Sequence, residues 1–347
     1  MDSLLQHLWH FKNIFPLEMA LTPGVFLFVL SWVRPRRWVS FPAGVRRLSL
    51  LTRLGVWGSL AVLAAATTAN WLAINDPQQI QDGGWWQRPL PLLAAACVAA
   101  LVAFALHREL LPPVAQRAIA PRRRWWALAP LTLLLIASAI AGVLLLTTLW
   151  HSALGVSAPP GANLYGIGPL QGDLPVYMPA PDGIGYIWGA GWPHHLATMI
   201  ALLLAAAALL GTLASDANRP SPAHRTSGGG LEDRRATARV LLIIFIGGAL
   251  LTLGAVWAHV GFIGGFSVGI YPATPGLPDQ PIVNVGTGYG DFAFILHWGG
   301  YVLQGIGAAV LLRLAVDSCR AHYAARRGAG AAELVEVPAS TEAEAAR

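Results

Sequence analysis

The chain has 347 residues, of which 55% are hydrophobic and only 12% are charged, and its mean hydropathy is +0.54. A soluble globular domain carries about 25% charged residues, so this composition excludes an ordinary soluble enzyme. Several apolar runs approach the roughly 20 residues that a helix needs to cross a bilayer. The sequence therefore predicts an all-α, polytopic integral membrane bundle that has the lipid bilayer as its first partner.

The apolar runs predict seven transmembrane helices. In chain order they cover residues 16–33, 54–74, 89–107, 125–150, 192–214, 240–260 and 292–313. No basic segment precedes the first run and no small-residue cleavage site follows it, so we expect a retained helix rather than a signal peptide. Pro23 falls early in this helix, where a missing N–H group is tolerated.

Arginine and lysine predict the orientation of the bundle. The segments 34–53, 108–124, 215–239 and the tail from Arg313 hold 21 of the 23 basic residues, and only Lys12 and Arg88 lie in the alternate segments. Basic residues stay on the cytoplasmic side, so we expect the N-terminus outside and the C-terminus inside. The net charge of +6 is therefore a topology signal and indicates no nucleic-acid partner. The excess of arginine over lysine favours a bacterial cell membrane.

This topology predicts six segments along the chain. They are an outer N-terminal segment with the first span (1–33), the second and third spans with basic cytoplasmic loops (34–124), a hairpin repeat A with a long outer loop (125–214), a cytoplasmic linker (215–239), a hairpin repeat B with a long outer loop (240–313), and a cytoplasmic tail (314–347). The Ala/Glu-rich tail is expected to be disordered. The outer loops are rich in Gly, Pro and aromatic residues, which indicates ordered loops packed on the membrane surface.

The two hairpins share one sequence pattern, which indicates a parallel internal repeat. Each carries Trp and then His at the outer end of its first helix, followed by a long loop that ends in Gly-x-Gly-Tyr. A histidine follows this tyrosine by eight residues in both copies, from Tyr186 to His194 and from Tyr289 to His297. Both hairpins run in the same direction through the membrane, so the repeat is parallel rather than inverted.

The second copy of the tyrosine motif, GTGYGD, ends in the letters of a potassium-channel selectivity filter. Such a filter needs Thr-Val-Gly-Tyr-Gly at the end of a pore helix. Here Gly286 and Thr287 occupy the first two positions, and prolines recur at every third residue from Pro272 to Pro281, which forbids that helix. We interpret the motif as a glycine turn that leads into the last span, with Tyr289 at the membrane interface.

Histidine is the residue type with the most chemistry to offer, because the spans hold almost no carboxylate and no catalytic motif. His151, His194, His259 and His297 stand at the outer ends of four spans. A rise of about 1.5 Å per residue places them at a common depth. Imidazoles on facing helices bind haem iron, copper and zinc. The sequence therefore predicts a cofactor, haem b or copper, held either within each hairpin or across the repeat.

Two neighbours extend this predicted site. His195 follows His194 directly, and Met199 lies one turn further along, so both are candidate metal ligands. Thr147, Thr252, Tyr301 and Gln304 are candidates for orienting the imidazoles through hydrogen bonds. The alternative interpretation is interfacial histidine, since Trp and Tyr residues crowd the same belt.

Three classes of function are compatible with these patterns. The first is a membrane-embedded redox or metal-binding protein, a subunit of a membrane complex, that exchanges electrons with quinone or with another membrane subunit. The second is a non-catalytic scaffold or assembly subunit, which suits a plain apolar core. The third is a transporter or channel component, against which stands the scarcity of charge within the spans.

Overall fold

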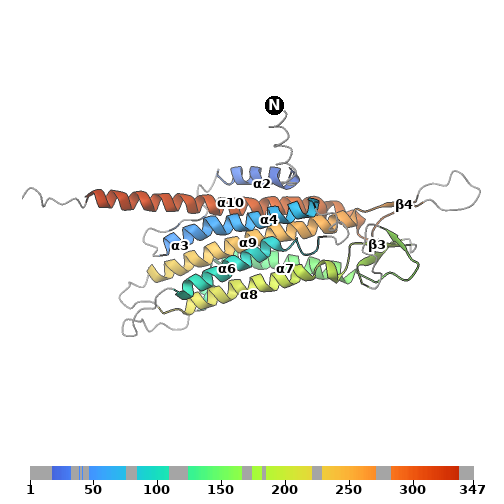
Figure 1. Ribbon diagram of the computed structural model, residues 1–347, viewed down its shortest axis with the longest axis horizontal. Helices are drawn as coiled ribbons and strands as arrows, with labels where there is room; N and C mark the ends of the chain where they lie inside the picture. The colour runs from blue at the N-terminus through green and yellow to red at the C-terminus, as the bar shows by residue number, and fades with distance from the viewer. Residues whose placement is uncertain are drawn as a thin grey trace, which may run out of the picture.

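The computed structural model describes residues 18–32, 39, 41, 47–75, 84–108, 124–165, 174–181, 185–220, 229–270 and 283–335. Helices dominate this part of the chain, and six of them are long and apolar enough to cross a membrane. They are the continuous helix of α3 (Leu48–Arg53), the π-helical turn η1 (Leu54–Gly58) and α4 (Ser59–Asn75), then α6 (Leu90–Arg108), α7 (Leu131–Ala153), α8 (Leu196–Asn218), α9 (Gly229–Gly264) and α10 (Gly290–Val335). They lie side by side along the long axis of the molecule (Figure 1). The chain is therefore a multi-pass helical membrane protein.

Six of the seven predicted spans have a long apolar helix among the described residues. The remaining predicted span, 16–33, coincides in part with α2 (Glu18–Leu30), which has 13 described residues. Residues 16, 17 and 33 of that span lie outside the described residues, so the seventh span stays a prediction.

The short helix α2 nevertheless packs along α10. A Cβ atom at Gly24 would lie 3.2 Å from the carbonyl oxygen of Gly305. Eight residues further along both helices, the guanidinium carbon of Arg313 lies 4.2 Å from the centre of the Trp32 ring. The steps from Gly24 to Trp32 and from Gly305 to Arg313 both run eight residues toward the C-terminus. The two segments therefore run in the same direction at this contact.

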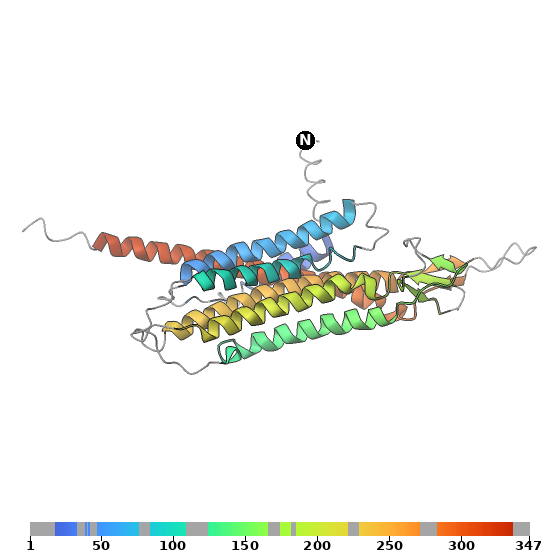
Figure 2. The ribbon, with the colours of Figure 1, turned by 60° about the horizontal axis from the view of Figure 1, so that its bottom comes forward.

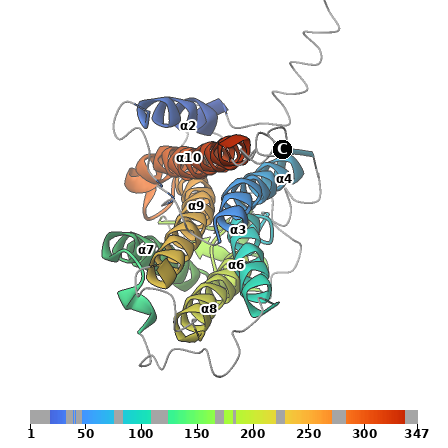
Figure 3. The ribbon, with the colours of Figure 1, turned by 90° about the vertical axis from the view of Figure 1, so that its left-hand side faces the viewer.

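The helix α9 forms the centre of the bundle. Viewed along the long axis, α9 is surrounded by α10, α4, α6, α8 and α7 (Figure 3). Its residues from Val240 to Leu253 are buried without a break. A helix that is hydrophobic on all sides belongs in the interior, so the sequence of this segment fits its place.

Two helices continue beyond the predicted membrane boundaries. Helix α9 begins at Gly229, inside the predicted linker, and α10 runs to Val335 through a segment that the sequence predicts to be disordered. Ala, Arg and Glu favour helix even where the apolar pattern ends, which explains both extensions. Residues 336–347 of the tail lie outside the described residues.

The two loops that are predicted to lie outside hold two small β-sheets, a feature that the all-α prediction leaves out. In the first, β3 (Gly185–Trp188) pairs in parallel with β1 (Asn163–Tyr165) and antiparallel with β2 (Tyr177–Pro179). In the second, β4 (Val268–Ile270) pairs antiparallel with β5 (Val283–Val285). The three-stranded sheet lies at the outer ends of α7 and α8 (Figure 2). It thereby covers the end of the bundle that carries most of the predicted site.

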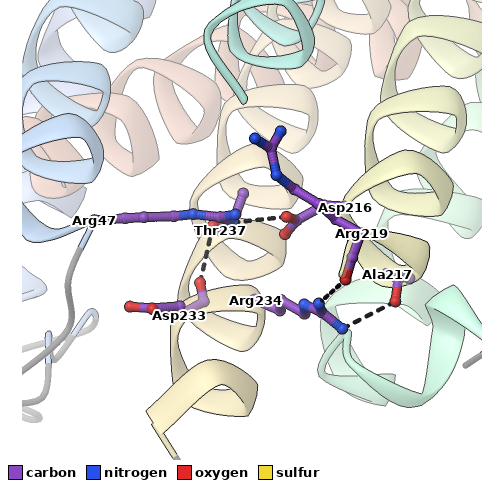
Figure 4. Close-up of polar contacts among 7 residues, drawn as sticks. All are labelled: Arg47, Asp216, Ala217, Arg219, Asp233, Arg234 and Thr237. Atoms are coloured by element: carbon purple, nitrogen blue, oxygen red, sulfur yellow. Dashed lines mark hydrogen bonds and ion pairs between the residues drawn. The ribbon is translucent and has the colours of Figure 1, made fainter. Parts of the chain in front are cut away.

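At the opposite end of the bundle, two of the arginines that predict the topology connect α3, α8 and α9 through polar contacts (Figure 4). Arg47 precedes α3, and its Nη1 lies 2.6 Å from Oδ1 of Asp216, near the end of α8. Arg234 of α9 donates to the carbonyl oxygens of Ala217 and Arg219, at the C-terminus of α8. These contacts satisfy carbonyl groups that a helix end leaves open, so their role is structural.

Candidate functional site

Three helical segments bring four imidazoles together at the end of the bundle that carries the three-stranded sheet. His151 ends α7, His194 closes the short helix η4 (Trp192–His194), His195 precedes α8 and His259 lies on α9. The ring centres of His151 and His195 are 5.0 Å apart, and those of His194 and His259 are 5.9 Å apart. His259 also lies 6.2 Å from His151 and 6.5 Å from His195. We call these four residues the histidine cluster.

Local backbone geometry places His194 and His195 in this cluster. Gly191 has φ +98°, and a Cβ atom there would overlap the carbonyl oxygen of Pro175. Only glycine adopts this conformation readily, so the chain can turn sharply from β3 into η4. The N–H of Gly191 donates to the carbonyl oxygen of His151 at 3.1 Å, which joins the loop to the end of α7.

A chain of hydrogen bonds determines two of the histidine tautomers. The hydroxyl of Tyr289 donates to the carbonyl oxygen of Val260 at 3.1 Å, because a carbonyl can only accept. The phenol oxygen then accepts from Nε2–H of His151 at 2.9 Å. His151 Nδ1 therefore carries a lone pair and accepts from Nε2–H of His195 at 2.8 Å. By the same logic, Nδ1 of His195 also carries a lone pair.

Several polar atoms in and beside the cluster are buried without a hydrogen-bond partner. Within the described part of the chain, this is true of Nδ1 of His195 and of both ring nitrogens of His194. The hydroxyls of Ser152 and Thr198, which lie near these histidines in sequence, are in the same state. Buried polar groups are nearly always hydrogen-bonded, so a concentration of unsatisfied atoms indicates a place for a ligand.

The surroundings of the cluster keep its imidazoles neutral. His194 is only 3% exposed. Burial first, and then the positive charge of Arg88, lower the pKa of His194 to about 3. The pKa of His195 is also lowered, mainly by burial. Arg88 reaches the cluster by donating from Nη1 to the carbonyl oxygen of His194 at 3.2 Å. A neutral imidazole is the form that binds metal ions, so the burial of these rings favours ligand chemistry over charge.

The cluster is not a closed metal site as folded. Among the residues that the structure describes, no three His, Cys, Asp or Glu side chains converge as ligands of one ion. The physical reason lies in the hydrogen bonds, since His151 and His195 bond each other and Nε2 of His259 lies 3.2 Å from the carbonyl oxygen of Gly189. A metal would have to replace the bond between His151 and His195.

The structure does not bring all six predicted site residues together. His151, His194, His195 and His259 form the cluster, whereas His297 bonds the carbonyl oxygen of Ala258 through Nδ1 at 3.0 Å and faces other aromatic rings. Met199 is half-buried one turn beyond His195, and its N–H makes the ordinary helical bond to the carbonyl oxygen of His195 at 2.9 Å. The predicted pairing of His259 with His297 within one hairpin is therefore absent from the described contacts.

Sequence reasoning misses two residues of the site. The motif predicts Tyr289 at the membrane interface, yet the side chain is 8% exposed and its hydroxyl bonds His151. Arg88 stands out in the sequence only as an exception to the charge pattern. Signals for both were present, since Tyr289 belongs to the repeated Gly-x-Gly-Tyr motif and Arg88 is one of two basic residues on the outer side.

The turn around Tyr289 is not a channel filter in its geometry. The hydroxyl of Thr287 donates to the carbonyl oxygen of Gly264 at 2.7 Å, and the N–H of Gly290 bonds back to the carbonyl oxygen of Thr287. The segment is thus a tight turn into α10, with the tyrosine side chain directed into the bundle.

Comparison with protein-family models, with curated proteins and with solved structures gives no match for this chain. The function is accordingly argued from the site alone.

Proposed function

We propose that this chain is a membrane-embedded metal-binding protein that holds copper through the histidine cluster near its outer face and serves in electron transfer as a subunit of a membrane complex. One observation carries the proposal. Four imidazoles, three of them buried, lie with ring centres 5.0–6.5 Å apart, and three of their ring nitrogens have no hydrogen-bond partner among the described residues.

The spacing of the rings supports a single ion. A metal-bound imidazole nitrogen lies about 2 Å from the ion, which puts the ring centre about 3 Å away. Two rings on one ion are then separated by about 5 Å at a tetrahedral angle and about 6 Å when opposed. The observed separations run from 5.0 Å between His151 and His195 to 6.5 Å between His195 and His259. Rotation of the rings could therefore bring the nitrogens onto one ion with little backbone movement.

The ligand types favour copper over other metals. All four donors are imidazoles, which suit copper and zinc, and divalent copper binds more tightly than the other first-row ions at a given nitrogen site. The phenol of Tyr289 holds the far nitrogen of His151, as hydrogen bonds to ligand histidines commonly do. Copper also changes oxidation state, which suits electron transfer to a quinone or a neighbouring subunit.

Haem b is the less well supported cofactor. Bis-imidazole ligation needs two rings opposed across a porphyrin plane, and the direct bond between His151 and His195 at 2.8 Å leaves no space between that pair. The pair formed by His194 and His259, with rings 5.9 Å apart and tilted by 38°, is the one that could adopt such an arrangement.

The metal content of the purified protein tests the proposal. Protein from copper-supplemented cells, purified without chelator, is expected to contain stoichiometric copper by mass spectrometry. His194→Ala and His259→Ala should each remove most of it, because each deletes one imidazole of the cluster. His107→Ala, at the exposed inner end of α6, is the matched control and should retain the metal.

Two other results would contradict a copper site in the histidine cluster. A monodisperse protein that is metal-free as purified and takes up no Cu⁺ after reduction would refute the copper site and favour the scaffold function. A Soret band that disappears in His194→Ala would instead assign haem to the same cluster. Gel filtration of each variant separates loss of metal from loss of fold.

A further inference from the structure

His297 forms a second polar site, separate from the histidine cluster. It lies where α10 contacts α9, and α9 separates α10 from α8 (Figure 3). The ring centre of His297 lies 5.1 Å from that of Tyr301, 6.1 Å from Trp298 and 6.4 Å from Phe262. Phe262 is 62% exposed and Trp298 is 41% exposed, so this group faces outward from the bundle.

The depth of the site places it in the outer leaflet. His297 is the eighth residue of α10, about 10 Å from the outer end of the helix. The exposed neighbours on the same helix, Phe294, Ile295 and Val302, are all large and apolar. The surface around His297 is therefore suited to hydrocarbon chains rather than to water.

Two polar atoms on this apolar surface have no hydrogen-bond partner among the described residues. His297 donates from Nδ1 to the carbonyl oxygen of Ala258 at 3.0 Å, so Nε2 carries a lone pair. Neither Nε2 of His297 nor the hydroxyl of Tyr301 has a hydrogen bond to any residue that the structure describes. Lipid chains cannot satisfy an acceptor or a donor, so an unsatisfied polar group in hydrocarbon is unfavourable. An acceptor and a donor stand side by side here, open to a ligand that arrives through the membrane.

We propose that His297 and Tyr301 bind the head group of a lipid-soluble hydroquinone, with one ring hydroxyl donating to Nε2 of His297. A hydroquinone has the three required properties: it dissolves in the bilayer, carries hydroxyl donors and presents a flat ring to aromatic side chains. The oxidised quinone has carbonyl acceptors instead and would accept from the hydroxyl of Tyr301. The two side chains thus complement both forms.

The choice of a hydroquinone over other hydroxyl-bearing lipids rests on the proposed redox function. The location supports that choice, because the carbonyl that accepts from His297 belongs to Ala258, the residue before His259 of the cluster. A bound head group would lie one hydrogen bond and one peptide unit from the proposed copper site.

Binding of decylubiquinol and of decylubiquinone to the full chain in phosphatidylcholine nanodiscs tests the inference. The unmodified protein should bind both saturably. His297→Asn keeps an amide donor where Nδ1 stood, but its carbonyl oxygen takes the place of Cδ2 and leaves no acceptor at the position of Nε2, so the Kd for decylubiquinol should rise about tenfold. Tyr301→Phe should weaken decylubiquinone binding more than decylubiquinol binding. His107→Asn, far from the site, should change neither.

The experiment separates this inference from the copper proposal because it is run on copper-loaded and on chelator-treated protein. Saturable binding that depends on His297 in metal-free protein supports the hydroquinone site even if the copper site fails. Equal binding by the unmodified protein and His297→Asn, or no saturable binding, overturns the inference. Loss of binding when phosphatidylethanolamine replaces phosphatidylcholine would also overturn it, since a lipid ammonium would then be the natural donor to His297.

Discussion

At the scale of single residues, the hydroxyl of Tyr289 orders the histidine cluster. It bonds both the carbonyl oxygen of Val260 and Nε2 of His151, so one phenol sets the direction of the hydrogen bond between His151 and His195.

From the sequence alone, Gly288 is expected to adopt a positive φ, as glycines in turns often do. The structure gives a positive φ to four glycines among its described residues, 84, 161, 189 and 191, and Gly288 is not among them. The residue of that turn that matters to the site is the tyrosine.

We expect Tyr289→Phe to destabilise the protein by about 1–3 kcal/mol, because it leaves the buried Nε2–H of His151 without an acceptor. Thermal unfolding in detergent, followed by circular dichroism, measures the effect. Tyr186→Phe is the control, since Tyr186 holds the equivalent position in the first hairpin and is only half-buried. Equal melting temperatures for the Tyr289 variant and the unmodified protein would contradict the assigned hydrogen-bond chain.

At the scale of elements, glycines set the distance between α9 and α10. A Cβ atom at Gly254 would overlap the carbonyl oxygen of Gly300, and one at Gly261 would overlap the backbone nitrogen of His297. Small residues that allow backbones to meet are the usual basis of helix association in membranes, where lipid is as apolar as the side chains. The same contact holds His297 against the carbonyl of Ala258, so it positions the second site as well.

Gly300→Ala should separate α9 from α10 and lower both the melting temperature and the yield of folded protein. Its methyl group would overlap the backbone of Gly254 and Ala258. Gly142→Ala on α7 is the matched control, because nothing lies within 4 Å of the added Cβ atom. Alanine is favoured over glycine in a helix by about 1 kcal/mol, so this control should be neutral or stabilising. Destabilisation by both substitutions to the same extent would argue against the close contact.

At the scale of the whole molecule, the charge pattern and the histidine cluster define opposite ends of the bundle. Arg47 and Arg234 hold the inner ends of α3, α8 and α9 together, while the cluster and the three-stranded sheet occupy the other end. The sidedness of these ends follows from the distribution of arginine and does not depend on whether α2 is counted as a span. The outside position of the N-terminus does depend on α2.

Cysteine labelling in intact cells tests this orientation. In a background without Cys97 and Cys319, a cysteine replacing Leu164 of β1 should react with a membrane-impermeant maleimide. A cysteine replacing Asn218, exposed at the inner end of α8, should react only after the cells are permeabilised. The reverse pattern would invert the bundle and place the histidine cluster on the cytoplasmic side.

The sequence by itself determined the membrane class and the helical character of the chain, and it predicts the polarity of the bundle. Each of these follows from short-range properties: apolar runs of membrane length, and arginines confined to alternate segments. It also located three of the four clustered histidines at helix ends, with His195 as a substitute for His194.

The tertiary structure alone decided which polar atoms meet. The side chain of His259 joins the cluster, while the backbone carbonyl of the preceding residue, Ala258, accepts from His297 of α10. No periodicity shows that Tyr289, in the turn before α10, contacts His151 of α7, or that Arg88 reaches His194 from a turn distant in sequence. Contacts between residues far apart in the chain depend on how helices rotate and approach one another, and that is set by packing of the whole bundle rather than by any local stretch of sequence.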